Sequence, residues 1–456
     1  MSDAGLTAEM TEDFISKLCT DYKIYTSLTE EARANSSIKR GLRNDDGTGV
    51  MIGCTKVGNV LGYSIVDGER VPMEGRLIYR GYDLSDLVDA YQREDRMGFP
   101  EVAYLLLFGH LPTQERYEMF QSLLHGYTAL PDNFTEDMIL KNPSRDIMNK
   151  LGRSVLALYS CDPTPDDTSV QNMMRQSIEL VARMPVIAAY AYVVKRHYFE
   201  NDSLYLHRPE PGLSTAENFL RMIRPDKQYT AEEARLLDLC LVCHAEHGGG
   251  NNSTFSCRSV ASTGTDTYSC IAAAVGSLKG PKHGGANRQV LNQFEEVKAN
   301  IRDWKDDEEV AAFVRRILLG EVSDRSGLVY GMGHAVYTLS DPRTVILRRS
   351  ARKLAQQKGM LNELELMEAI ERVTPAVFSE ITGSEKIICA NVDMYSGLMY
   401  RMLDISPDLF TPLFATARIT GWCAHRMEEA LTGGRIYRPA YKPLIKHKEY
   451  VPFSER

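Results

Sequence analysis

Apolar residues recur at helical spacing through most of this chain, and this periodicity constrains its fold more than any other feature. The clearest segments of this kind are residues 99–112, 234–244, 268–280 and 342–359. At the last of them Asp341 can cap the helix, Pro342 fits its first position and Gly359 can end it. We therefore predict a large, mainly α-helical protein.

Strand-like alternation is scarce, and its best candidate is residues 51–68. These residues combine β-branched side chains with frequent glycines, which favours a small hairpin near the N-terminus. We expect residues 76–87 to continue the hairpin and then to begin a helix. The proline-rich stretches 161–169 and 207–215 predict loops, and residues 436–452 predict an extended basic tail that lies against another surface.

The composition bounds the class of protein. Hydrophobic residues make up 43% of the 456 residues and charged residues 25%, so a sizeable core is expected and disorder is not. The net charge of −8 disfavours nucleic acid or an anionic membrane as the main partner. No apolar run is long enough to span a membrane, and the acidic residues 1–18 resemble neither a secretory signal nor a transit peptide. Nine cysteines then indicate reduced thiols, and we expect a cytoplasmic protein.

Residues 244–287 hold the strongest functional signal. His247 and His283 each lie against a glycine-rich turn, and each is followed within a few residues by an asparagine, Asn251 or Asn287. Glycine lets backbone N–H groups approach a small ligand closely, and histidine can act as acid, base or hydrogen-bond donor near neutral pH. The pattern predicts a site for a small, charged, oxygen-rich substrate.

The same stretch begins with Cys240-Leu-Val-Cys243-His244, which spells a c-type haem attachment motif. That motif is specific only in an exported protein, whereas these cysteines lie on a continuous apolar helix. A zinc site would need two further ligands, and Cys257 and Cys270 lack the spacing. We interpret the two cysteines as buried core thiols and His244 as a structural residue.

Other candidate residues are isolated along the chain. Gly331-Met-Gly333-His334 lacks the third glycine of a dinucleotide fingerprint, since position 336 is valine. Arg343 could bind a carboxylate through its guanidinium fork, or lie at the surface near a helix cap. Asp393 could cap the helix that follows it or act as a catalytic carboxylate.

Two more arginines are unusual in their settings. Arg418 lies in an apolar helical segment, where a buried charge must be paired or must face a ligand. Arg438 precedes a proline in the tail and could reach a neighbouring subunit.

Taken together, these residues resemble the citrate synthase family. The motifs that carry the resemblance occur in the family's order: HAEHGGGNNST (244–254), GSLKGPKHGGAN (276–287), GMGHAVYTLSDPR (331–343), NVDMYSG (391–397), LFTPLFATAR (409–418) and YRP (437–439). Weaker matches at 78–87 and 99–112 extend it, so that it covers most of residues 50–440. The first fifty residues match no motif of the family.

The resemblance implies a mainly α-helical homodimer with two domains in each subunit. The large domain would comprise residues 1–285 and 408–456, and the small domain residues 286–407. The active site would lie in the cleft between them, and closure would exclude water from a reactive thioester.

The resemblance also implies a role for each candidate residue. His283 would hydrogen-bond the acetyl carbonyl, Asp393 would remove a methyl proton, and His334 would polarise the ketone of oxaloacetate. The oxaloacetate binders would be His247, Asn251, Arg343, Arg418 and, from the partner subunit, Arg438. Acetyl-CoA would be held by the backbone of Leu328, Val329 and Gly331 and by Lys279 and Lys282.

These roles make chemical sense. Two carboxylates need at least two guanidinium groups, and a weakly acidic methyl group can lose its proton to an aspartate only if the developing enolate is stabilised. No metal or cofactor is required. In one departure from many relatives, Thr338-Leu339-Ser340 stands where a basic residue would meet CoA phosphates.

Three alternatives remain open at this point. A 2-methylcitrate synthase would use propionyl-CoA with the same residues, because one methylene changes selectivity by only about 1–3 kcal/mol. A citrate-cleaving enzyme would need an ATP-using partner domain, and no P-loop motif is present. A helical haem or zinc protein would use Cys240 and Cys243.

Overall fold

The computed structural model covers the chain and describes residues 8–26, 38–67, 69–432, 434–445 and 447–456. The chain divides into two compact units. The terminal unit comprises Met1–Gly53 and Arg438–Arg456, and the main unit comprises Cys54–Tyr437. The prediction that residues 1–18 are neither a secretory signal nor a transit peptide rests partly on residues 1–7, which lie outside the described residues.

The terminal unit contains one long helix that the sequence analysis did not anticipate. Its regular elements are the helix α1 (Ala8–Thr26) and the short 3₁₀ turns η1 (Arg40–Leu42) and η4 (Phe453–Glu455). The tail prediction is confirmed in its conformation, since the described part of residues 436–452 has no regular secondary structure. What surface the tail lies against stays a prediction.

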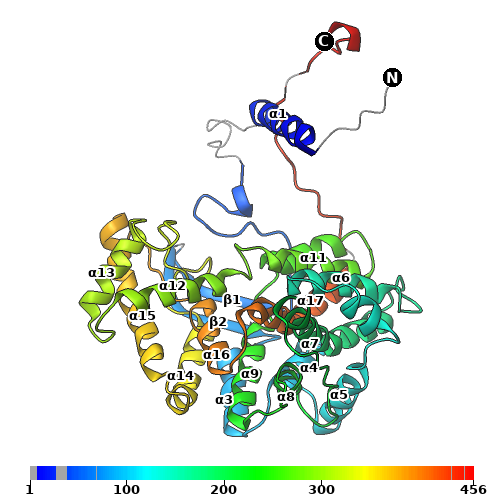
Figure 1. Cartoon of the computed structure of the whole chain (residues 1–456), viewed down its shortest axis with the longest axis vertical. Coiled ribbons are helices and arrows are strands. Elements are labelled where there is room, and N and C mark those ends of the chain that lie inside the picture. Colours follow the sequence, from blue (N-terminus) through cyan, green and yellow to red (C-terminus); the bar gives the residue numbers. More distant parts are fainter. Residues whose placement is uncertain (1–7, 27–37, 68, 433, 446) are drawn as a thin grey trace. The chain divides into compact units, whose positions relative to one another are not determined.

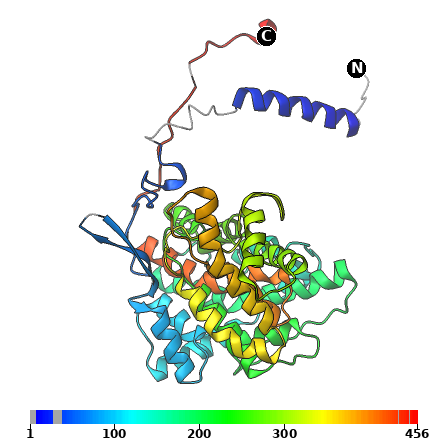
Figure 2. The same cartoon turned by 90° about the vertical axis from the view of Figure 1, so that its left-hand side faces the viewer.

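The main unit begins with a three-stranded antiparallel sheet. Its strands, in the order β1-β2-β3, are β1 (Gly58–Val66), β2 (Glu69–Tyr79) and β3 (Tyr82–Asp83). Gly58 pairs with Tyr79 and Val66 with Glu69, so the hairpin turns between residues 66 and 69. Figure 2 shows this hairpin projecting from the helices.

The hairpin was therefore placed too early by the sequence analysis. Residues 51–57 form no strand, and the second strand is 69–79 rather than part of 51–68. The charged residues of 69–76 hid this strand, because most of it is exposed and only its end, at Leu77 and Tyr79, is fully buried. The predicted continuation is confirmed, since a helix begins at Leu84.

The rest of the main unit is helical. Up to the predicted site, the elements are α3 (Leu84–Arg93), α4 (Phe99–Phe108), α5 (Gln114–Tyr127), the π-helical turn η2 (Thr135–Leu140), α6 (Ile147–Tyr159), α7 (Val170–Glu200), α8 (Thr215–Ile223) and α9 (Ala231–His244). After it they are α10 (Asn252–Ala261), α11 (Thr267–Lys279), α12 (Ala286–Asn300), α13 (Asp307–Leu318), α14 (Pro342–Gln357), α15 (Leu361–Thr382), α16 (Val392–Met402), η3 (Pro407–Leu409) and α17 (Phe410–Leu431).

The helical fold class is thus confirmed, and so are the four helices expected from periodicity, which are α4, α9, α11 and α14. The cap of α14 is also as predicted. The Asp341 carboxylate accepts from the backbone N–H of Arg343, and Pro342 occupies the first turn. Both predicted loops, 161–169 and 207–215, lie between helices, except that Thr215 already begins α8.

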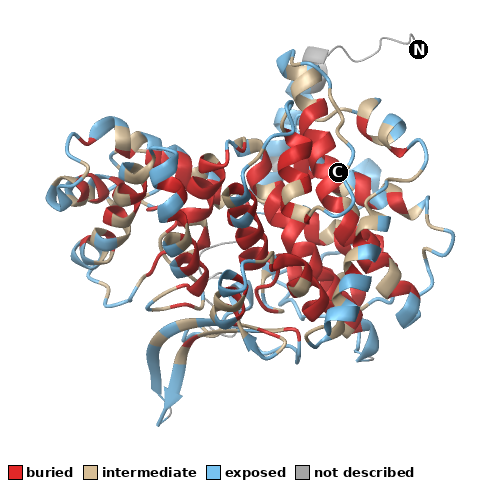
Figure 3. Ribbon diagram, turned by 90° about the horizontal axis from the view of Figure 1, so that it is seen from below, coloured by how far each residue is buried: buried red, intermediate tan, exposed pale blue. Residues whose placement is uncertain are grey.

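The core of the main unit is built around α7 and α17. Helix α17 packs against α7, α9, α10 and α11, and Figure 3 shows buried residues along the inner faces of the helices. In the described part of the chain, α7 alone has the length and apolarity of a membrane span, and 94% of its apolar window is buried inside the protein. This marks it as a core helix.

Within the main unit, Figure 1 shows α12 to α16 gathered on one side and α5 to α8 with α11 on the other. Helices α9 and α17 lie between the two groups (Figure 1). Helix α9 contacts both α14 and α16, and α17 contacts α12. The domain boundaries at residues 285 and 407 stay a prediction.

Candidate active site

The six central candidate residues come from segments far apart in the sequence. His247 follows the end of α9, His283 lies between α11 and α12, His334 precedes α14, Arg343 opens α14, Asp393 lies in the first turn of α16, and Arg418 lies within α17. Helix ends and glycine turns therefore supply all of them except Arg418.

A backbone pairing brings the His334 segment to the start of α16. The N–H of Gly333 donates to Cys389 O at 2.7 Å, and Asn391 N donates to Gly331 O at 2.8 Å. Gly331 has a φ of 84°, and a Cβ there would lie 2.8 Å from the sulfur of Met394. Only glycine fits this close approach, which fixes the His334 turn against the helix that carries Asp393.

The rings of His247 and His334 lie edge to face, with centroids 5.2 Å apart, and His334 stacks on Tyr337 at 4.4 Å. The Nδ1 atom of His334 accepts from the backbone N–H groups of Val336 and Tyr337, at 3.0 and 2.9 Å. A ring nitrogen that accepts carries no proton, so the neutral ring has its proton on Nε2. His334 can therefore act as a neutral hydrogen-bond donor through Nε2.

His283 is held by a small hydrogen-bonded group. Its Nε2 atom lies 3.1 Å from both Asn251 Oδ1 and Ser253 Oγ. The indole N–H of Trp422 donates to Ser253 Oγ at 3.1 Å and occupies one of its lone pairs. Ser253 Oγ donates to Asn251 Oδ1 at 2.9 Å. Because an amide oxygen can only accept, His283 Nε2 carries the ring proton in this arrangement; when the serine proton turns to Nε2 instead, the ring carries its proton on Nδ1. Burial, and then the charge of Arg418, lower the pKa of His283 to about 4, so the ring is neutral at pH 7.

Asp393 is not the cap of α16. Asn391 fills that position, with its side-chain oxygen accepting from the backbone N–H of Asp393 at 3.0 Å. The Asp393 carboxylate is thus left for another role. Burial raises its pKa to about 6 against the opposing positive charges of Arg343 and Arg418. Such a carboxylate is a stronger base than an ordinary aspartate and is still ionised at neutral pH.

Arg343 is buried, and much of its fork is already engaged. Its Nε and Nη2 atoms donate to the two carboxylate oxygens of Asp341, at 3.0 and 2.6 Å. The bidentate contact that the sequence analysis assigned to a substrate is therefore made to Asp341. The remaining nitrogen, Nη1, is the part of the guanidinium best placed to meet a ligand.

Arg418 is fully buried, and its charge has no ion-pair partner among the described residues. Its Nε donates to the carbonyl of His244 at 2.5 Å, while Nη1 and Nη2 have no hydrogen-bond partner in the described part of the protein. Burial lowers its pKa to about 10, with Glu246 the largest opposing charge. At neutral pH the group is still a cation, and a buried, unsatisfied cation is costly unless an anion binds to it.

The pKa of His247 depends on four of the other candidate residues. Burial holds the pKa of His247 well below its ordinary value, and Arg343, His334, Arg418 and His283 add to the effect in that order. The Nε2 atom of His247 is buried and has no partner among the described residues. The candidate residues therefore offer two histidines of lowered pKa, His247 and His283, two cationic arginines and one carboxylate.

Sequence reasoning missed the part played by two nearby residues. His244, interpreted as structural, is fully buried, holds Arg418 through its carbonyl, and has both ring nitrogens without a partner in the described chain. Tyr79 at the end of β2 donates to Val242 O at 3.0 Å and so ties the sheet to the end of α9. A backbone contact of this kind leaves no signal in a single sequence.

The other candidate residues lie further from this cluster in their contacts. Gln293 holds the CoA candidate segment, donating to Leu328 O and accepting from Tyr330 N, both at 2.9 Å. Val329 is buried, Lys282 is exposed, and Lys279 forms an ion pair with Asp146 at 3.2 Å. Arg438 is exposed and belongs to the terminal unit.

The cysteines of the haem-like motif are buried in α9, as expected for core thiols. Burial raises the pKa of Cys243 to about 12 and that of Cys240 well above its ordinary value, so both stay protonated. Among the residues that the structure describes, no three histidine, cysteine or acidic side chains are grouped as metal ligands.

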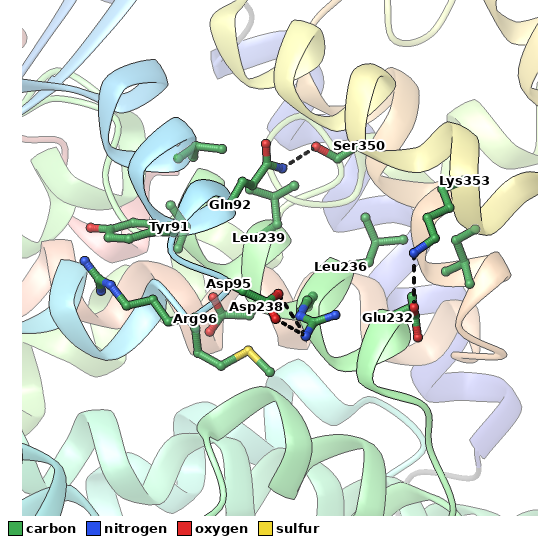
Figure 4. A pocket seen from close by; sticks show the side chains of 15 residues that line it. Tyr91, Gln92, Asp95, Arg96, Glu232, Leu236, Asp238, Leu239, Ser350 and Lys353 are labelled. Atoms are coloured by element: carbon green, nitrogen blue, oxygen red, sulfur yellow. Dashed lines mark hydrogen bonds and ion pairs between the residues drawn. The ribbon is translucent and has the colours of Figure 1, made fainter.

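A separate cavity of about 350 Å³ lies between α3, α9 and α14 (Figure 4). Arg235 is paired with Asp95 and Lys353 with Glu232, as the dashed lines in Figure 4 mark, and Asp238 accepts from the backbone N–H groups of Gly98 and Phe99. It contains none of the candidate residues, and it lacks the unpaired buried cation that distinguishes the cluster around Arg418.

Comparison with known proteins finds similar chains of one family. A family model described as "Citrate synthase, C-terminal domain" matches residues 48–440. A citrate synthase of Synechocystis sp. is 37% identical over 86% of this chain and 90% of its own length. A 2-methylcitrate synthase of Shewanella oneidensis is 31% identical over 83% of this chain and 92% of its own.

Two solved structures are similar across nearly the whole chain. The citrate synthase of Pyrobaculum aerophilum superposes with a TM-score of 0.73 at 29% identity, covering 92% of this chain and 95% of its own. The citrate synthase of Thermoplasma acidophilum, solved as a ternary complex with carboxymethyl coenzyme A and oxaloacetate, gives 0.75 at 27% identity and covers 92% of this chain and 100% of its own.

Proposed function

This chain belongs to the citrate synthase family, a family of acyltransferases, and from that premise we propose that it condenses acetyl-CoA with oxaloacetate and water to give citrate and free CoA. The observation that carries the proposal is the buried guanidinium of Arg418, whose Nη1 and Nη2 atoms have no partner among the described residues. A small anion is the ligand that such a group requires.

Oxaloacetate fits this requirement because it carries two carboxylates and a ketone. In the proposed complex Arg418 and the Nη1 end of Arg343 bind carboxylate oxygens, and His247 donates from its buried Nε2. Asn251 supports them from the start of α10. His334 donates its Nε2 proton toward the ketone oxygen and polarises it for attack.

Acetyl-CoA is activated by Asp393 and His283. The Asp393 carboxylate takes a proton from the acetyl methyl group, and the electron pair moves toward the thioester oxygen. His283 stabilises that oxygen by donating a hydrogen bond from Nδ1, the tautomer favoured when the Ser253 hydroxyl donates to Nε2. A neutral imidazole suits this step, because its N–H is closer in acidity to the enol than that of an imidazolium.

Carbon–carbon bond formation and hydrolysis complete the reaction. The enol carbon attacks the ketone carbon, and the ketone oxygen takes a proton from His334. Water then cleaves the citryl thioester, giving citrate and CoA. No metal or cofactor takes part in this scheme.

The assembly and the CoA site are part of the proposal. We infer a homodimer in which Arg438 of one subunit completes the oxaloacetate site of the other. The backbone of Leu328, Val329 and Gly331 holds the adenine end of CoA, while Lys279 and Lys282 meet its phosphates. We expect the enzyme to be cytoplasmic.

Release of CoA tests the proposal directly. The purified protein, given acetyl-CoA and oxaloacetate, should release CoA, while omission of either substrate should abolish release. Folded protein that releases no CoA from acetyl-CoA would refute the proposal. A parallel assay with propionyl-CoA tests the alternative 2-methylcitrate synthase activity. This alternative is supported by similarity to relatives of that name.

A further inference from the structure

A chain of buried polar groups lies behind the site and takes no part in the proposed chemistry. Glu246 Oε1 lies 2.9 Å from His425 Nε2, and His425 Nδ1 lies 2.9 Å from Nη1 of Arg258. Arg258 Nη2 lies 2.8 Å from Glu429, whose Oε2 accepts from the Tyr437 hydroxyl at 2.8 Å. Glu246 and His425 are fully buried, and Arg258 and Glu429 are nearly so.

The direction of each hydrogen bond in this chain is determined. A guanidinium can only donate, so His425 Nδ1 accepts from Arg258 and carries no proton. The imidazole proton then resides on Nε2, which donates to Glu246. Burial acts to raise the pKa of Glu246, yet the contact with His425 and the charge of Arg418 hold it below its ordinary value. Glu246 is therefore an anion that accepts a hydrogen bond from His425 Nε2.

One end of the chain supports the oxaloacetate turn. Glu246 directly precedes His247, and its Oε1 also accepts from the N–H of Gly248. Gly421 of α17 lies so close that a Cβ there would be 2.3 Å from Glu246 Oε2. The carboxylate is thus clamped between α17 and the turn, and it sets the position from which His247 projects.

The other end holds the residue that precedes Arg438. Besides its contact with Glu429, Tyr437 donates its backbone N–H to Ser262 Oγ at 3.2 Å and stacks on Phe255 with centroids 6.1 Å apart. Tyr437 is the last residue of the main unit, and Arg438 is the first of the terminal unit. The point from which Arg438 departs is therefore fixed to the same chain of groups that fixes His247.

We propose that Glu246, His425, Arg258, Glu429 and Tyr437 form a positioning network that couples the oxaloacetate turn of one subunit to the origin of its Arg438, and hence to the oxaloacetate site of the partner. The inference rests on the proposed function, because it requires oxaloacetate as ligand and Arg438 acting in the partner subunit. The five residues touch neither substrate. They act through His247 and Arg438, and so they affect oxaloacetate affinity rather than the chemical step.

Two matched tyrosine variants test the claim. Tyr437→Phe removes one hydroxyl–carboxylate hydrogen bond from the network, and Tyr268→Phe removes an equivalent bond of 2.7 Å to Asp162, outside it. Oxaloacetate binding is measured by calorimetry and kcat at saturating substrate. Tyr437→Phe should raise the Kd about 5-fold with kcat within about twofold, whereas Tyr268→Phe should change neither. Equal effects of the two variants on Kd would overturn the proposal.

Variants of His425 test the histidine itself. His425→Gln places an amide donor near the Nε2 position and should retain most of the oxaloacetate affinity, whereas His425→Phe removes both contacts and should lose it. If His425→Phe does not fold, His425→Asn serves instead, since its amide reaches only the Nδ1 position. The comparison is between His425→Gln, which keeps a donor to Glu246, and His425→Phe or His425→Asn, which loses it. Equal oxaloacetate Kd values for the two would count against the network.

The link to the partner site is tested by a double-mutant cycle. In an Arg438→Ala background, Tyr437→Phe should have a smaller effect on the oxaloacetate Kd than in the wild type, because only its route through His247 remains. Full additivity would refute the link. Binding is read independently of turnover, so a wild-type protein that binds oxaloacetate without releasing CoA refutes the proposed function alone, and one that binds no oxaloacetate refutes both.

Discussion

Asp393→Asn separates the catalytic role of this residue from its effect on stability. Its carboxylate is the proposed base, so the amide should reduce kcat on the order of 10³-fold, within the range for loss of a general base. Oxaloacetate should still bind, because Arg418, Arg343 and His247 are unchanged.

The same substitution should make the folded protein more stable at neutral pH. Burial raises the pKa of Asp393 from 3.8 to about 6. This shift of 6 − 3.8, about 2.2 units, corresponds to at most about 3 kcal/mol against folding when the group is ionised. Since unfolding entropy scales at about 2.1 cal/mol/K per residue, the gain amounts to about 3 °C in Tm for a chain of this size.

The sign of the pH dependence is fixed by the direction of the shift. An acid whose folded-state pKa is raised favours the folded state while it is protonated, and this contribution is lost as the pH rises through about 6. The difference in Tm between the variant and the wild type should therefore be absent below pH 4, open between pH 4 and 6, and stay constant above that.

Scanning calorimetry across pH 4–8, together with CoA release, measures both effects. Asp132→Asn, at an exposed loop position, is the matched control and should change neither Tm nor kcat. A kcat within tenfold of the wild type would remove Asp393 from the role of base. A variant no more stable than the wild type at pH 8 would refute the argument from burial.

Four further outcomes are expected. Arg418→Met should weaken oxaloacetate binding by about 3 kcal/mol, which is about 100-fold in the Kd measured by calorimetry. It should not lower Tm, because it replaces an unpaired buried charge. Tight binding of oxaloacetate by this variant would disprove the anion site. Ser253→Ala should lower kcat about 10-fold through loss of one hydrogen bond to His283, and an unchanged kcat would show that this contact does not set the working tautomer. The wild-type kcat/KM should fall below pH 6 by a factor approaching ten per unit as Asp393 becomes protonated, and a rate flat down to pH 5 would contradict that pKa. Mixed Arg438→Ala and Asp393→Asn subunits, each inactive alone, should recover about a quarter of wild-type activity, since half of the dimers would hold one complete site of two; no recovery would argue against sharing of Arg438.

The sequence predicted those parts of the molecule that depend on local patterns. The helices α4, α9, α11 and α14 followed from the spacing of apolar residues, and the cap at Asp341 from its place before Pro342. The sequence left Asp393 with two possible roles, as the cap of α16 or as a catalytic carboxylate. The cap is Asn391, two residues earlier, which has the same capping chemistry. Local pattern thus predicted helices better than it predicted the task of one polar residue.

Contacts between distant segments could not be predicted in this way. Glu246 contacts His425 across a separation of 179 residues, and Arg258 contacts Glu428 at 2.7 Å across 170, and no periodicity reports such contacts. The engagement of Arg343 by Asp341 and the support of Arg418 by a backbone carbonyl were missed for a related reason, since both depend on side-chain direction. The residue types were apparent from the sequence, but their partners required the fold.

The initial rate of CoA release with acetyl-CoA and with propionyl-CoA, each with saturating oxaloacetate, tests the central claim most directly. We predict release with both thioesters, reduced on the order of 10³-fold by Asp393→Asn, with a higher kcat/KM for acetyl-CoA and with citrate as its product. Release that is faster with propionyl-CoA would make the protein a 2-methylcitrate synthase, and no release from the folded protein with either thioester would refute the proposed condensation.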